Sequence, residues 1–185
     1  VGILPRESDG LTFYQGMAKT HTLFFYFHSG DVSVADLNVQ SLQFQLADRP
    51  VMDSEVYRSS GLFENIFIEK KLDYVEWGFI GMADSRIRAY GILAWGDAPD
   101  VGYTQQGRGN GELVWTNNEY DFPHAMMLMY VKSGERRMMD YVLTAAQHQM
   151  DVDICHYHPD PLRQGGQVIH SARHVSGYVA PCHQW

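Results

Sequence analysis

Two amphipathic segments on either side of Gly134 constrain the fold of this chain most strongly. The first starts after Asp121, with a proline in its first turn, and its apolar residues follow the i, i+3, i+4, i+7, i+8 spacing of a helix face: Phe122, Ala125, Met126, Met129 and Tyr130. The second has an apolar stripe of Met139, Val142, Leu143, Ala146 and Met150. Because only a short Ser-Gly link separates the two helices, we predict an antiparallel αα-hairpin that turns at Gly134.

Two further helices are expected before this hairpin. Ser33 is a suitable cap for a helix that reaches about Leu46, since Val34, Leu37 and Phe44 recur at roughly helical spacing. Asp48-Arg49-Pro50 then breaks the chain. The longest helical pattern covers residues 62 to 88, with a stripe of Phe63, Ile66, Phe67, Tyr74 and Trp77.

The N-terminal part has a different pattern. Residues 10 to 28 are expected to be β-structure, because the run up to His28 would place apolar residues on both faces of a strand. Such a strand needs cover on both faces, so we predict an interior strand. Residues 90 to 114 are rich in glycine and are expected to form a long loop, and long loops in compact domains are often functional.

Composition excludes several classes of protein. With 45% hydrophobic residues and 7 prolines, the 185-residue chain can bury a core and is not a disordered sequence. A net charge of -8 argues against a nucleic-acid partner. No membrane-spanning segment or signal peptide is recognisable, so localisation stays open between secreted and cytoplasmic. Both ends look cut, and we expect an internal segment of a longer protein.

Histidine is concentrated near the C-terminus, where six of the 9 lie from residue 148 onward: His148, His156, His158, His170, His174 and His183. Together with Arg163 and Arg173 they offer proton transfer and anion binding. The alternative is that these are ordinary exposed loop histidines. A divalent metal is a second alternative, because ligand types are dense in Asp151, Asp153, Cys155, His156 and His158. The His170, His174 pair lacks the glutamate of a metalloprotease motif.

A saccharide site is suggested just before the hairpin. Trp115 can stack on a sugar face, while Asn118 and Glu119 can bond hydroxyl groups. The alternative is that Asn118 and Asp121 only cap the helix and that Trp115 packs in the core. Nucleophilic catalysis finds no support, since the chain has no Gly-x-Ser-x-Gly elbow.

Several segments, in this order along the chain, resemble the exo-rhamnogalacturonan lyase family. They are Gly16-Met-Ala-Lys-Thr-His-Thr-Leu-Phe-Phe-Tyr-Phe-His28, Tyr57-Arg-Ser-Ser-Gly61, Tyr90-Gly-Ile-Leu-Ala-Trp-Gly-Asp97, Asn117-Asn-Glu-Tyr-Asp-Phe-Pro-His124 and Gly165-Gly-Gln-x-x-His170-x-x-x-His174-x-Ser-Gly177. The similarity covers nearly the whole chain. Each motif is weak alone, and their order and spacing carry the resemblance.

The resemblance implies a mainly α-helical fold with an N-terminal β portion. Residues 1–50 would be the end of a β-sandwich region with a short helix, and residues 51–185 the first part of an α/α toroid. The implied activity is a polysaccharide lyase that cleaves rhamnogalacturonan-type pectin by β-elimination at galacturonate. The partner would be an acidic plant cell-wall polysaccharide, with no required cofactor. We expect little or no activity from these 185 residues alone.

The elimination needs a base, an acid and a group that stabilises the enolate-like charge. We therefore expect catalytic roles for one set of residues: His170, His174, Tyr120 and Arg163. A second set is expected to bind substrate: Asn118, Glu119, His124, Arg173 and Trp115. Two alternatives stay open, a glycoside hydrolase on the same toroid, which would use a carboxylate pair, and a non-catalytic carbohydrate- or metal-binding module.

Overall fold

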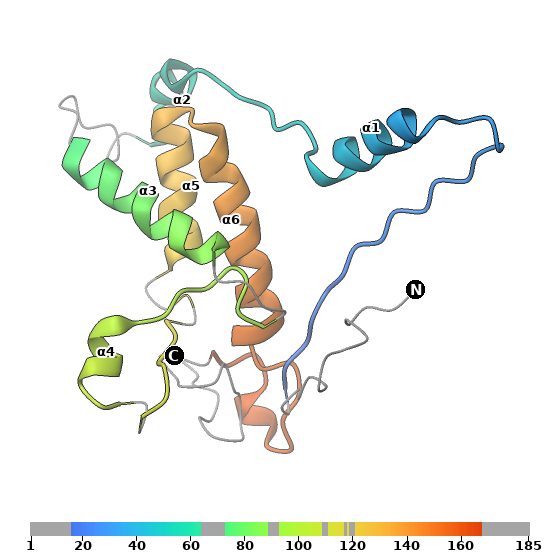
Figure 1. Ribbon diagram of the computed structural model, residues 1–185. Helices are drawn as coiled ribbons and strands as arrows, with labels where there is room; N and C mark the ends of the chain where they lie inside the picture. Colours follow the sequence, from blue (N-terminus) through green and yellow to red (C-terminus); the bar gives the residue numbers. More distant parts are fainter. Residues whose placement is uncertain are drawn as a thin grey trace.

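The computed structural model describes residues 16–63, 73–88, 93–108, 111–116, 118 and 121–167. This part of the chain is mainly helical, with six α-helices and no β-strand (Figure 1). In these residues, β-type backbone pairing occurs only at two isolated bridges, Pro99 with Trp115 and Ile154 with Gln167. No helix in the described ranges has the length and apolarity needed to cross a membrane.

The predicted hairpin is confirmed. Helix α5 (Phe122–Ser133) ends at Gly134, which adopts φ 67° and donates its N–H to the Tyr130 carbonyl at 2.8 Å. A residue with this left-handed conformation is normally glycine, because a side chain there is strained. Helix α6 (Arg136–His148) then runs back along α5, and α3 (Asp73–Ile87) packs against both helices (Figure 1).

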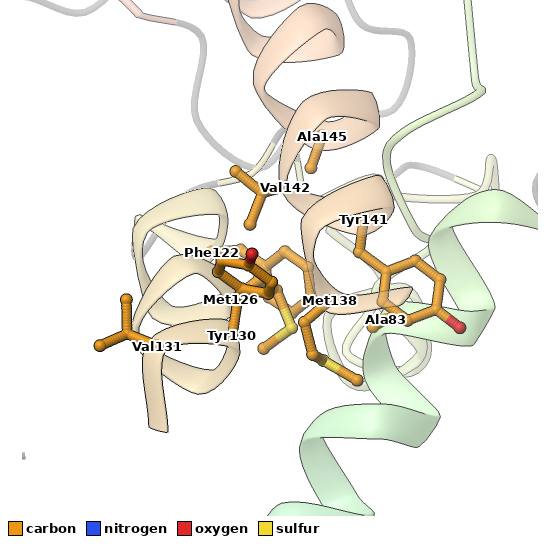
Figure 2. Packing of buried hydrophobic residues seen from close by; sticks show 9 residues of the cluster. All are labelled: Ala83, Phe122, Met126, Tyr130, Val131, Met138, Tyr141, Val142 and Ala145. Carbon is orange, nitrogen blue, oxygen red and sulfur yellow. The ribbon is translucent and has the colours of Figure 1, made fainter. Parts of the chain in front are cut away.

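The hydrophobic core lies between these three helices (Figure 2). Its buried members are Ala83, Phe122, Met126, Tyr130, Val131, Met138, Tyr141, Val142 and Ala145. The two tyrosines also satisfy their hydroxyl groups, as Tyr141 donates to Asp84 and Tyr130 donates to the Pro50 carbonyl. Burying one large apolar side chain contributes about 1.5–3 kcal/mol, so this cluster is the main source of stability in the helical body.

The apolar stripe predicted for α6 is partly wrong, because it is rotated about the helix axis, although the predicted Met139 does pack against the core. Val142 is the one predicted residue that is buried, while Leu143 and Met150 are exposed. The face that α6 buries consists of Met138, Tyr141, Val142, Ala145 and His148. Tyrosine and histidine bring polar atoms into this face, and each polar atom that is buried has to find a partner. A search for apolar residues alone therefore missed the true face.

The stripe predicted for residues 62 to 88 is also partly wrong. Residues 62 and 63 form a turn, residues 64–72 lie outside the described residues, and helix α3 is described from Asp73 to Ile87. Tyr74 and Trp77 are 91% and 75% exposed. The buried face of α3 instead presents Ala83 and Arg86.

Helix α1 (Val34–Gln45) is confirmed at both ends. The Ser33 hydroxyl accepts a hydrogen bond from the Asp36 N–H at 3.1 Å, and Leu46 is the C-terminal cap. None of the α1 residues is buried, so the helix stands away from the core (Figure 1). A short helix that was not expected, α2 (Ser54–Ser59), begins after the cap residue Asp53.

The predicted interior strand is not present in the described part of the N-terminal region. Residues 17–29 leave the helical body as one extended segment, without a neighbouring strand among the described residues (Figure 1). Residues 10–15 of the predicted β-structure lie outside the described residues. The long loop of residues 90 to 114 contains one short helix, α4 (Val101–Gln105), and the Pro99–Trp115 bridge closes its base.

Candidate functional site

A π-helical turn continues α6 and shapes the candidate site. Turn η1 (Gln149–Asp153) is closed by a hydrogen bond from the Ile154 N–H to the Gln149 carbonyl, at 3.0 Å. The five-residue spacing of such a turn places Asp153 next to His148, with Asp153 Oδ1 3.3 Å from His148 Nε2. Single π-helical turns are rare and often occur at functional sites.

His148 is held between one carbonyl and two carboxylates. Its Nδ1 lies 3.1 Å from the Trp95 carbonyl oxygen, which can only accept, so Nδ1 carries a proton and donates it. On the other side of the ring, Nε2 faces Asp153 at 3.3 Å and Asp97 Oδ2 at 4.0 Å. All three side chains are fully buried. The site is therefore a buried histidine that faces two buried carboxylates.

The loop before α4 reaches His148 because it has a glycine at the point of contact. Gly96 adopts φ +100°, and a Cβ there would lie 2.5 Å from the Thr144 carbonyl oxygen and 2.7 Å from the His148 Cβ. No larger residue fits this close approach. The next residue, Asp97, accepts a hydrogen bond from the Thr116 hydroxyl, and its Oδ1 lies 3.4 Å from the Asn118 N–H.

Asn118 connects this loop to the helices. Its Oδ1 accepts from Arg86 Nε at 3.2 Å, and its Nδ2 donates to the carbonyls of Gly96 at 3.1 Å and Ala145 at 3.3 Å. Asn118 is fully buried and adopts φ 50°, a left-handed conformation that asparagine tolerates better than most residues. The Arg86 guanidinium also lies 3.4 Å above the centre of the Phe122 ring. A single side chain thereby ties α3, α6 and the loop together.

Burial and charge change the protonation of this cluster. Burial raises the pKa of Asp153 to about 7, although the neighbouring His148 opposes the change. For His148, burial would lower the pKa, but the carboxylates of Asp153 and Asp97 outweigh burial and raise it. Burial lowers the pKa of Arg86 to about 10, with Asp97 acting against this effect. Near neutral pH, the His148–Asp153 pair therefore keeps a proton that an exposed pair would lose.

A third acidic residue, Asp151, anchors the N-terminal segment to the same end of the hairpin. Asp151 accepts hydrogen bonds from the Thr20 N–H at 2.7 Å, the Thr20 hydroxyl at 2.9 Å and Gln147 Nε2 at 2.9 Å. Its own carbonyl accepts from the Ala18 N–H at 2.9 Å. Burial lowers the pKa of the nearby Lys19, and Asp151 opposes that shift. Residues 16–20 are thus fixed against η1.

The structure places four of the predicted site residues. Asn118 belongs to the buried cluster, and Trp115 is half-buried at the bridge to Pro99. His124 is exposed, with Nδ1 2.9 Å from Asp121 Oδ2, and Arg163 is half-buried in η2 (Pro161–Arg163), 3.7 Å from Asp160. The other predicted site residues lie outside the described residues: Glu119, Tyr120, His170, Arg173 and His174.

The residues considered as metal ligands turn toward different partners. Asp151 binds Thr20, Asp153 faces His148, and the buried Cys155 donates to the Tyr157 carbonyl at 3.4 Å. Within the described ranges, no group of three His, Cys, Asp or Glu side chains has a metal-binding arrangement. The side chains of Asp151, Asp153 and Cys155 thus make separate contacts in this structure.

The sequence interpretation missed the centre of the cluster. Asp97 and Arg86 were not considered as site residues, His148 was named only as one of the six clustered histidines, and Asp153 was considered as a metal ligand alone. His148 carried a usable signal, because it falls on the buried stripe of α6, three residues after Ala145 and seven after Tyr141. A histidine on such a stripe needs buried partners. No protein-family model, curated protein or solved structure matches this chain.

Proposed function

We propose that this chain is part of a polysaccharide lyase that cleaves rhamnogalacturonan-type pectin by β-elimination at galacturonate. In this proposal residues 51–185 form the first part of an α/α toroid, and residues 1–50 form the end of a β-sandwich region. The order of the five motifs supports the assignment, and the described helices supply a helical hairpin of the kind from which toroids are built.

The observation that carries the proposal is the convergence of loops at one end of the hairpin. Asn118 precedes α5, yet its Nδ2 donates to Ala145 near the end of α6. Asp153 follows α6 and contacts His148. Segments before the first helix and after the second helix are thereby held at the same end, where a toroid places its cleft.

The buried cluster then has a positioning role. Asn118 directly precedes Glu119 and Tyr120 in the sequence, and Asp153 starts the segment that leads through Arg163 toward His170. Fixing these two chain segments on rigid helices would orient the groups for proton transfer and carboxylate binding. Because His148 and Asp153 are fully buried, we assign them to this support and not to contact with substrate.

The reaction class is tested with the longer protein that carries this chain and with rhamnogalacturonan as substrate. Elimination forms a carbon–carbon double bond in the uronate, so ultraviolet absorbance should rise in step with the reducing ends. Reducing ends released without this absorbance would indicate glycoside hydrolysis and overturn the proposal. Retention on immobilised pectin without turnover would instead indicate a carbohydrate-binding module, which also contradicts it.

A further inference from the structure

The segment His21–His28 has exposed aromatic side chains, and its backbone makes no hydrogen bond to another described residue. Among the described residues, no backbone hydrogen bond reaches it, although the same chain is fixed just before it, at Ala18 and Thr20. Five consecutive side chains are 44–91% exposed: Leu23, Phe24, Phe25, Tyr26 and Phe27. An extended segment with free edges and an apolar surface is ready to pair with another strand.

One face of the segment is already organised. The ring of Phe24 stacks on Phe44 of α1 with the ring centres 5.0 Å apart, and Phe24, Tyr26 and His28 form a row with centre distances of 6.3 and 5.5 Å. Alternate side chains therefore point to opposite faces, as in a β-strand. In Figure 1 most of the segment runs clear of helices α3, α5 and α6.

We propose that this segment pairs, antiparallel, with the same segment of a second copy of the chain, about a two-fold axis at Phe25. In this register Leu23 lies opposite Phe27, Phe24 opposite Tyr26, and Phe25 opposite its own copy. Every apolar side chain then faces an apolar side chain, and Thr22 faces His28. Self-pairing about a two-fold axis is the usual geometry of a homodimer.

The charge pattern supports this occupant and this register. Residues 20–30 carry no Lys, Arg, Asp or Glu, so no like charges oppose one another when two copies pair. The first charges on either side are Lys19 and Asp31, which are of opposite sign and equally distant from Phe25. A shift of the register by one residue places Thr22 or His28 opposite a large apolar side chain and separates these charges.

Pairing with a second copy uses one edge of the segment. The other edge has no partner among the described residues, so the inference does not depend on the lyase proposal and is compatible with a β region in a longer protein. Each proposal can be refuted without the other, because the mass of the chain in solution and the absorbance of a cleaved polysaccharide are independent measurements.

The mass of the purified 185-residue chain, measured by light scattering after size exclusion, tests the inference. We expect twice the 21.1 kDa of one chain. Phe25→Lys and Phe25→Asp should each give monomers, because like charges would face each other at the axis. Mixing the two variants should restore the dimer, since Lys then faces Asp. A wild-type monomer, or a mixture that stays monomeric, would overturn the inference.

Double variants test the register within one chain. Leu23→Lys with Phe27→Asp should still dimerise, whereas Leu23→Lys with Phe27→Lys should be monomeric. Leu162→Lys is the matched control, because Leu162 is exposed but lies in η2, far along the chain from the segment, and it should leave the dimer unchanged. Far-ultraviolet circular dichroism should be the same for all variants. Equal masses for both double variants would show that the segment does not pair in this way.

Discussion

The protonation of Asp153 gives the sharpest prediction for the buried cluster, and the variant that tests it is Asp153→Asn. Burial raises the pKa of Asp153 from the ordinary value of an aspartate to about 7, so folded protein binds a proton that unfolded protein releases between about pH 4 and pH 7. A folded-state pKa that is raised contributes stability at low pH, and this stability is lost as the pH rises through the folded-state value.

The magnitude follows from the width of this window. Each proton bound by the folded state alone lowers the free energy of unfolding by about 1.4 kcal/mol per pH unit of increase. As the pH rises from 5 to 8, through the folded-state pKa of Asp153, the wild-type protein should therefore lose about 3 kcal/mol. The raised pKa of His148 acts in the same direction, because it also delays proton release in the folded state.

Asparagine at position 153 cannot titrate, so this loss should disappear. Its amide can donate to Nε2 of a neutral His148, and the Nδ1 contact with Trp95 is kept. As the pH rises from 5 to 8, the free energy of unfolding of Asp153→Asn, measured relative to that of wild type at the same pH, should therefore increase by about 3 kcal/mol.

Urea unfolding followed by tryptophan fluorescence at several pH values gives the comparison. Asp31→Asn is the matched control, because Asp31 is exposed, and its pH profile should follow that of wild type. Parallel profiles for wild type and Asp153→Asn would refute the reasoning, since they would show that folding does not change the proton affinity of Asp153.

Two substitutions test the packing of the site and the core. Asn118→Ala removes the acceptor of Arg86 and the donor to Gly96 and Ala145, so the free energy of unfolding should fall by about 3 kcal/mol, measured by urea unfolding at pH 7. An unchanged midpoint would contradict the role of Asn118 as the connecting residue. Met126→Ala removes a fully buried side chain and should cost about 2–5 kcal/mol by the same assay, while the exposed Met150→Ala should cost little.

The helical hairpin could be predicted from the sequence because local signals agree there. The spacing of Phe122, Met126 and Tyr130 indicates one helix face, and Gly134 supplies the left-handed conformation that ends α5. The Ser33 cap of α1 is a local signal of the same kind. Each of these features depends on residues a few positions apart, and a sequence pattern contains that information.

The polar cluster could not be predicted in the same way because its members are distant in the sequence. Arg86, Asp97, Asn118 and His148 come from four segments, and the contacts between them exist only once the chain has folded. The face of α6 was misjudged for a related reason, since His148 is polar by type but buried through its partners. For the exposed segment around Phe25, the sequence pattern predicts a paired strand, but the described residues provide no partner strand. A local pattern can indicate an extended backbone without identifying the strand that pairs with it.

The central proposal is that loops at the open end of the hairpin, opposite Gly134, carry an elimination site, and it is tested by the rate at which the longer protein forms unsaturated uronate from rhamnogalacturonan. The double variant His170→Ala, His174→Ala should lose this absorbance while its helical circular dichroism is unchanged, because it removes the proposed proton-transfer groups. The exposed control His28→Ala should keep the wild-type rate. Full activity in the double variant would contradict the account.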